Sequence, residues 1–429
     1  MRLLKLLINP NPQELRRPDI EGSSVEEVVR AIIQGVKEGG DRALRNYTKE
    51  FDRADIDSLK VPLPMKEDLP EEFKKAIERA KDNIYKFHST QKPHDEYVEV
   101  EPGITCWRQS VPIERVGLYI PGGSAPLFST LLMLAIPAQI AGCREIVVVT
   151  PPRRDGSIDP AILYSAQLCG VTQIYRVGGA QAIGALAYGT ETIPKVDKIF
   201  GPGNRYVTEA KQQVSKTECA IDLPAGPSEV MVVIDASSSL PYAAADLLSQ
   251  AEHDSDSQVV LLVVAKDEAE GKRTISAVEG EIIKQKENLS RQDIVERSLS
   301  RSWAVVVTEP TLLLPLINGY APEHLIINTK DYKEVAKGVK SAGSVFLGEY
   351  ACESLGDYAA GTNHTLPTAR WARSHSGVSL DSFYKKITFQ EVTKEGLLSI
   401  GESVKILAEA ASLDGHARAV TIRLDEVEK

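Results

Sequence analysis

Cysteine is scarce in this chain of 429 residues, which has only five: Cys106, Cys143, Cys169, Cys219 and Cys352. Their number is odd, they lie far apart, and none belongs to a Cys-x-x-Cys pair. This pattern excludes the disulfide framework of small secreted domains and indicates a reducing compartment. We therefore expect a cytoplasmic protein, although an organellar precursor that has lost its leader would look the same.

Long hydrophobic runs and an excess of basic charge are also missing. The most apolar stretch, residues 127–143, contains Pro137 and stays below the roughly 18 apolar residues of a membrane span. The apolar run at the N-terminus is broken at Asn9 and Pro10 and predicts no secretion signal. The 50 Lys and Arg residues against 60 Asp and Glu give a net charge of −10, which argues against a broad nucleic-acid-binding surface. We expect neither a membrane nor a nucleic acid as partner.

What the chain does contain is a globular composition, 42% hydrophobic and 26% charged, in which β-rich and helical segments alternate. A first set of strands is expected at residues 116–120, 145–150, 173–177 and 198–200. A second set is expected at residues 230–234, 259–264, 304–308, 325–327 and 345–347. Helices are expected at residues 127–141, 161–168, 242–251 and 331–341, with a charged helix pair within 266–300. Such alternation predicts βαβ units and parallel sheets.

The predicted fold class is therefore α/β, with two Rossmann-like parallel-sheet domains and small terminal extensions. Residues 1–20 are assigned to an N-terminal extension, and residues 21–115 together with 230–370 to a first, discontinuous α/β domain. Residues 116–229 are assigned to a second α/β domain, and residues 371–429 to a C-terminal extension.

One of the seven histidines, His253, lies in the stretch Ser249-Gln250-Ala251-Glu252-His253. On a helix, Gln250 and His253 would share a face, so that an amide oxygen and a ring nitrogen could hold one divalent ion. The competing interpretation is an ordinary helix C-terminus, where the helix dipole favours histidine. From spacing alone the second interpretation is preferred, because glutamine is an uncommon zinc ligand.

Other polar groups lie where the chain changes direction. Pro322 ends a helical segment and a strand follows, so Glu323 and His324 fall at a helix-to-strand junction suited to acid–base chemistry, with an exposed capped turn as an equal alternative. Asp357 and His364 flank a glycine-containing loop, and His416 lies near the C-terminus in Leu-Asp-Gly-His. Taken singly, these last residues are better explained as loop polarity.

Three glycine-rich turns follow β-rich runs, at residues 121–125, 177–181 and 200–204. The backbone N–H groups of such turns can approach a phosphate. None has the Gly-x-Gly-x-x-Gly spacing of the dinucleotide fingerprint, and no acidic residue is assigned to a ribose. Taken alone, the turns indicate α/β connections and favour dinucleotide binding only weakly.

Taken together, these segments resemble the histidinol dehydrogenase family over roughly residues 20–425. The stretches that carry the resemblance are VGLYIPGGSAPLFST, VGGAQAIGALAYGTE, KIFGPGN, AIDLPAGPSEV, DLLSQAEHDSDSQ, YAPEHL, GDYAAGTNHTLPT and LDGHARAV, in this order. Long segments in a fixed order are more specific than a pattern of a few residues. The resemblance implies an enzyme that oxidises L-histidinol, a small amino alcohol, to L-histidine with NAD, the last step of histidine biosynthesis.

The resemblance also implies roles for individual residues. One zinc per subunit would be held by Gln250, His253 and Asp357, with His416 supplied by the partner subunit of an intertwined homodimer. Glu323 and His324 would be the acid–base pair. NAD contacts would fall on Tyr119, Gln181 and Asn204 within residues 116–229, and substrate contacts on Ser129, Ser228 and His364.

One position departs from the family pattern. The family usually has a substrate-contacting glutamate five residues before its final histidine, and here that position is Ala411. The change removes a hydrogen-bond acceptor and a negative charge, so it puts the substrate in question more than the type of reaction. A relative that oxidises another small primary alcohol, such as dihydroxypropane sulfonate, is therefore an alternative.

Two further alternatives lie outside this chemistry. An enzyme of the aldehyde dehydrogenase type would form a thiohemiacetal on a cysteine, with Cys143 or Cys352 as candidates. However, Cys143 lies at an apolar helix end, where an inert thiol is expected. A catalytically silent metal- or nucleotide-binding protein is disfavoured by the retained Glu323–His324 pair and by the four implied ligand positions.

Overall fold

The computed structural model describes residues 3–17, 25–63, 69–122, 127–224 and 226–427, so part of the expected glycine-rich turn at 121–125 lies outside the described residues. The chain divides into two compact units, residues 1–91 with 114–382 and residues 92–113 with 383–429. Across the described ranges, no helix combines the length and the apolar character needed to cross a membrane.

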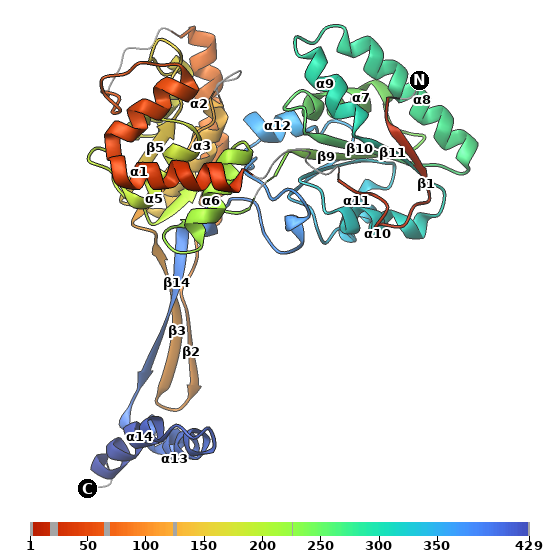
Figure 1. Cartoon of the computed structure of the whole chain (residues 1–429). Helices are drawn as coiled ribbons and strands as arrows, with labels where there is room; N and C mark the ends of the chain where they lie inside the picture. The colour runs from red at the N-terminus through yellow and green to blue at the C-terminus, as the bar shows by residue number, and fades with distance from the viewer. Residues whose placement is uncertain (1–2, 18–24, 64–68, 123–126, 225, 428–429) are drawn as a thin grey trace. The chain divides into compact units, whose positions relative to one another are not determined.

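The larger unit contains a six-stranded parallel sheet in the order β1-β11-β10-β9-β12-β13 (Figure 1). Its strands are β1 (Lys5–Ile8), β9 (Glu229–Ile234), β10 (Gln258–Val264), β11 (Trp303–Val307), β12 (His324–Asn328) and β13 (Ser344–Leu347). One face is covered by α7 (Leu240–Ala251), α8 (Glu268–Lys286) and α9 (Gln292–Ser300), and the other by α10 (Pro310–Tyr320) and α11 (Tyr332–Lys337). Because both faces are covered, every residue of β9 is buried and alternate side chains enter the two cores.

The same unit contains a five-stranded parallel sheet in the order β6-β5-β4-β7-β8. Its strands are β4 (Arg115–Tyr119), β5 (Glu145–Thr150), β6 (Gln173–Arg176), β7 (Lys198–Phe200) and β8 (Ala220–Ile221). The connecting helices are α3 (Phe128–Ala141), α4 (Pro160–Leu168), α5 (Gly179–Tyr188) and α6 (Arg205–Ser215). Every strand expected from the sequence is present within one residue of its expected bounds, which confirms the α/β fold class.

Two N-terminal helices pack beside the five-stranded sheet. Helix α1 (Glu26–Tyr47), which continues into a π-helical turn at Thr48–Asp52, contacts α5 and α6, and α2 (Glu71–Ser89) contacts α3 and α4. The apolar face of α1, including Val29 and Val36, joins the core of that sheet. The assignment of residues 21–115 and 230–370 to one domain stays a prediction. The packing of α1 and α2 instead favours grouping these helices with the five-stranded sheet.

The smaller unit is a three-stranded antiparallel sheet, in the order β14-β3-β2, followed by two helices. Its elements are β2 (Glu96–Glu101), β3 (Ile104–Pro112), β14 (Tyr384–Val392), α13 (Lys394–Ala410) and α14 (Asp414–Val427). The rings of Tyr97, Trp107 and Phe389 stack across the three strands at centroid distances of 5.4 and 5.2 Å. The sequence analysis missed this sheet, because its strands are mostly exposed and carry no buried apolar run.

Candidate active site

The carboxyl ends of β4 and β7 meet at the point where the five-stranded sheet reverses its direction of growth. The chain adds β5 and β6 on one side of β4, and β7 and β8 on the other. Such a switch point leaves a crevice outside the strand ends where α/β proteins bind ligands. Tyr119 ends β4, and its hydroxyl accepts a hydrogen bond from the Gly179 N–H (3.2 Å) at the start of the helix that carries Gln181. Asn204 caps α6 after β7, so all three residues expected to contact NAD come to one sheet edge.

The loop between β7 and α6 is fixed by a buried ion pair. The side chains of Lys211 and Asp222 are 5% and 0% exposed. Asp222 accepts a hydrogen bond from the Gly201 N–H, and Lys211 donates to the Gly201 carbonyl, each at 2.8 Å. Gly201 has φ +121°, and a Cβ there would overlap the carbonyl oxygen of Tyr119. The loop therefore lies directly against the end of β4.

A cluster of possible metal ligands lies where α7 contacts the short helix α12 (Glu353–Tyr358). One ligand atom from each of His253, Glu353 and Asp357 lies within 4.8 Å of the others. Glu353 and Asp357 are four residues apart on α12 and therefore share a face. The cluster unites two of the residues implied by the family resemblance with Glu353, which the sequence analysis missed.

The local structure differs from the sequence-based expectation at two of these residues. Helix α7 ends at Ala251, so His253 is not helical but lies in the following turn, where its N–H donates to the Gln250 carbonyl at 3.2 Å. Asp357 was expected in a loop, but it lies on α12. Both corrections have one cause. His253 lies in a turn and Asp357 on a helix of only six residues, and neither segment is long enough to show a helical periodicity in the sequence.

Two buried polar side chains, Glu353 in this cluster and Gln250 on α7, lack hydrogen bonds to described residues. Gln250 is 0% exposed and Glu353 1% exposed, and none of their four side-chain oxygen and nitrogen atoms has a hydrogen-bond partner within the described part of the chain. Buried polar groups are nearly always paired, so these atoms are available to a bound ligand. Imidazole nitrogen and carboxylate oxygen are zinc donors, and the residues present therefore fit that metal.

The Glu323–His324 pair lies at the amino end of β12 and is buried, with 5% and 3% exposure, which argues against an exposed capped turn. The Glu323 Oε2 accepts a hydrogen bond from the Glu229 N–H at 2.8 Å. The Nδ1 of His324 lies 3.2 Å from the Glu229 carbonyl, which can only accept, so Nδ1 carries the proton. Nε2 is then free to take a proton, and it lies 3.4 Å from the Asp357 carboxylate.

Negative charge predominates around this pair. Burial raises the pKa of Glu323 and of Glu353 to about 8, because a charged carboxylate loses its hydration there. Burial alone would lower the pKa of His324, but the carboxylates of Glu353, Glu323 and Asp357 outweigh it and raise that pKa to about 10. A cation next to these carboxylates would relieve their mutual repulsion.

The residues expected to contact substrate fall into two places. His364 Nε2 lies 2.9 Å from the Thr130 hydroxyl, next to Ser129 in the first turn of α3. Ser228 directly precedes β9, and its carbonyl accepts from the Gln258 N–H at 3.1 Å. His416 is exposed on α14 in the smaller unit, and Ala411 is the C-cap residue that follows α13 there. Neither of the last two is placed relative to the larger unit.

Three of the five cysteines offer little reactive thiolate. All five are free. Burial raises the pKa of Cys143, Cys169 and Cys219 to about 12 each, so these thiols stay protonated near neutral pH. This disfavours Cys143 as a nucleophile and weakens the aldehyde dehydrogenase alternative.

Comparisons with known proteins identify the family of the chain. The family model described as histidinol dehydrogenase matches residues 15–424. The chain is 51% identical over 434 residues to histidinol dehydrogenase from Bacteroides fragilis, covering 99% of this chain and 100% of the relative. It is 50% identical over 421 residues to the chloroplastic histidinol dehydrogenase of Arabidopsis thaliana, covering 96% and 88%. The crystal structure of histidinol dehydrogenase from Elizabethkingia anophelis matches with a TM-score of 0.94 and 46% identity over 100% of both chains. The chain is therefore a dehydrogenase and belongs to the histidinol dehydrogenase family.

Proposed function

We propose that the protein oxidises L-histidinol to L-histidine through bound histidinal, with zinc as its metal and two molecules of NAD as electron acceptors. The observation that carries the proposal is the meeting of His253, Glu353 and Asp357 beside the buried Glu323–His324 pair. Family membership supports the choice of alcohol. The enzyme would then complete histidine biosynthesis, and the five free cysteines support a cytoplasmic location.

Zinc would be held by Gln250, His253 and Asp357 with a partner's histidine and would orient the substrate, while NAD would accept hydride at the edge formed by Tyr119, Gln181 and Asn204. His324 presents Nε2 to the alcohol and takes its hydroxyl proton as hydride leaves the carbon. Glu323 then takes a proton from the water that adds to the aldehyde. His324 returns its first proton to the aldehyde oxygen as the water adds, which gives the hydrate. It then takes a hydroxyl proton of the hydrate as the second hydride leaves, and the resulting acid ionises to the carboxylate.

We propose that Glu353 supplies a further carboxylate to the zinc site, either directly or by fixing Asp357. Both of its oxygens are buried without a hydrogen bond to any described residue, and it shares a helix face with Asp357. The only sequence signal for this role is an acidic residue four positions before Asp357 on a segment too short for periodicity.

We propose a homodimer in which His416 of one subunit completes the zinc site of the other. Within the smaller unit, α13 and α14 pack mainly on each other and bury few residues. The apolar side chains that remain exposed on this helix pair are Leu398, Ile406, Leu407, Leu413 and Ile422. Monomeric proteins rarely expose large apolar patches, so several exposed apolar side chains on a thinly buried helix pair favour a partner subunit as their cover.

The experiment that tests the proposal counts products and metal. Purified protein with limiting histidinol and excess NAD should form two NADH per alcohol, and metal analysis should find one zinc per subunit. Chelation should remove both zinc and activity, and added zinc should restore them. Dihydroxypropane sulfonate is assayed in parallel because Ala411 replaces the usual glutamate. Oxidation of that alcohol in preference to histidinol would establish the alternative substrate.

The NAD site predicts a strong effect of Gly201→Ala. The left-handed φ and the overlap with the Tyr119 carbonyl force the β7–α6 loop away from its position. Because the loop is displaced, we expect the KM for NAD to rise roughly tenfold or more. This corresponds to a loss of about 1.4 kcal/mol or more of binding free energy. Steady-state kinetics at varied NAD measures this. Gly280→Ala is the matched control, because a Cβ at Gly280 meets nothing within 4 Å. Equal KM values for the two variants would remove the loop from the NAD site.

A further inference from the structure

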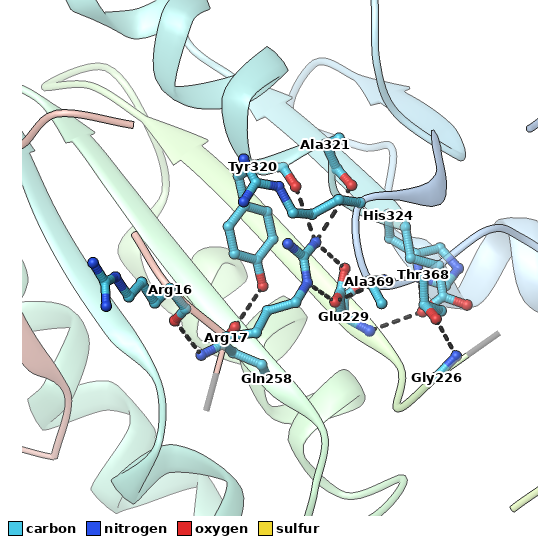
Figure 2. Close-up of polar contacts among 12 residues, drawn as sticks. Arg16, Arg17, Gly226, Glu229, Gln258, Tyr320, Ala321, His324, Thr368 and Ala369 are labelled. Carbon is cyan, nitrogen blue, oxygen red and sulfur yellow. Dashed lines mark hydrogen bonds and ion pairs between the residues drawn. The ribbon is translucent and has the colours of Figure 1, made fainter. Parts of the chain in front are cut away.

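Arg17 lies against the amino ends of β9 and β12, although it is far from both in sequence (Figure 2). Its side chain is 18% exposed, and that of its partner Glu229 is 4% exposed. The Nε of Arg17 pairs with one carboxylate oxygen of Glu229, and Nη2 donates to the other at 2.7 Å. A guanidinium bonded to both oxygens fixes a carboxylate in orientation as well as in place.

Arg17 also holds the turn that leads to the acid–base pair. Its Nη2 donates to the carbonyl of Tyr320 at 3.0 Å and lies 3.5 Å from that of Ala321, and the guanidinium carbon lies 4.0 Å from the centre of the Tyr320 ring. Tyr320 ends α10, where a cation is favoured by the terminal carbonyls. Ala321 has φ +53°, which is unfavourable for a residue with a Cβ. The Arg17 contacts stabilise this turn two residues before Glu323.

Glu229 connects Arg17 to both catalytic groups through its backbone. Its N–H donates to Glu323, and its carbonyl accepts from His324. Its side chain is held by Arg17 and by the Ala369 N–H, which donates at 3.1 Å (Figure 2). A change in the orientation of Glu229 would therefore disturb both hydrogen bonds at once.

The segment that carries Arg17 is itself anchored. Strand β1 pairs with β11 at the edge of the six-stranded sheet. The indole N–H of Trp303 donates to the Arg16 carbonyl at 2.8 Å. The Tyr320 hydroxyl donates to Gln258 at 2.7 Å, which fixes the ring under the guanidinium. The guanidinium is thus held from the sheet side as well as by Glu229.

We infer that Arg17 is a positioning residue for the Glu323–His324 pair, which it orients through Glu229 and through the turn between α10 and β12. It touches neither catalytic side chain. The inference rests on the proposed oxidation of histidinol. It predicts a loss in the rate of the chemical steps and not in substrate binding, because the misplaced groups act on protons in the transition state.

The test measures kcat and KM for histidinol and for histidinal, together with zinc content and thermal melting, in the full-length protein. Arg17→Ala should lower kcat for both substrates roughly 10- to 100-fold, with KM for histidinol within about threefold of wild type. Arg17→Lys should recover part of the loss, because an ammonium can pair with Glu229 but not with both oxygens and the turn. Arg16→Ala is the matched control: its side chain is exposed and only its carbonyl makes the inward contacts. That variant should keep wild-type kcat.

A double-mutant cycle with Glu229→Gln separates positioning from general weakening. This variant keeps the backbone contacts to Glu323 and His324 but loses the charged partner of Arg17. If Arg17 acts in part through Glu229, the loss in the double variant should be clearly smaller than the product of the two single losses. The inference would be overturned if the loss in kcat of the double variant equalled the full product of the two single losses. It would also be overturned if the Arg17→Ala enzyme were folded, zinc-loaded and as fast as Arg16→Ala.

Should Arg17→Ala fail to fold, Arg17→Lys and Glu229→Gln carry the test, and wild-type kcat in both would overturn the inference. Failure of the proposed function gives a different result: the wild-type protein itself would form no NADH from histidinol.

Discussion

Replacing His324 with alanine is expected to lower kcat for histidinol oxidation by roughly 100- to 10,000-fold, the usual contribution of a general base. The ring is oriented for proton abstraction, because Nδ1–H donates to the Glu229 carbonyl and Nε2 is the nitrogen left to take a proton. The nearby carboxylates raise the pKa of His324 to about 10, and a bound cation that neutralises them would lower it and free the Nε2 lone pair near neutral pH. The kcat and kcat/KM values should fall together, since the lost interaction belongs to the transition state. Stopped-flow NADH formation measures the chemical step directly.

The control for this variant is His94→Ala, which removes an exposed histidine from the smaller unit and should leave kcat unchanged. A His324→Ala enzyme with near-normal turnover and normal zinc content would remove His324 from the reaction.

Glu323→Gln separates the two oxidations. The amide keeps an oxygen that can accept from the Glu229 N–H but cannot take a proton from water. We expect it to impair histidinal oxidation more than histidinol oxidation, and this is measured by supplying each substrate separately. The opposite pattern would reverse the roles given to Glu323 and His324.

The sequence predicts the two parallel sheets well because their strands are buried on both faces. Such strands read as short apolar runs, as in β5 and β10, and helices between them supply a second periodicity. The antiparallel sheet of the smaller unit could not be predicted in this way. Its strands β2 and β14 are largely exposed, and β14 pairs with β3 across most of the chain.

Part of the candidate site could be predicted from the sequence, because some of its residues lie next to a local structural signal. Pro322 marks the junction that places Glu323 and His324, so a local signal was enough there. The cluster of possible metal ligands needs α7 and α12 side by side, and nothing local in the sequence brings Glu353 to His253. The family resemblance implied a set of ligands that did not include Glu353. The lack of hydrogen bonds to the oxygens of Glu353 is a property of packing alone.

A mixture of two inactive variants is expected to regain activity if the zinc site is shared between subunits. His416→Ala should lose zinc because each site then lacks the histidine supplied by the partner subunit. His253→Ala should lose zinc because each site then lacks a histidine of its own subunit. In a mixed dimer, the subunit that carries His416→Ala keeps its His253 and receives an intact histidine from the other. One site in each mixed dimer is then complete. Random exchange of equal amounts should restore about one quarter of wild-type activity, with zinc in the same proportion.

The matched control mixes His253→Ala with Gln250→Ala. Both residues lie in the larger unit of the same chain, so every site in that mixture lacks one ligand whichever subunits pair. Activity should stay at the level of the parent variants. If His416 instead served its own chain, the first mixture would be as inactive as the control, because each site would again lack one ligand. Recovery in the first mixture alone therefore requires the exposed helix pair α13–α14 of one subunit to reach the zinc site of another.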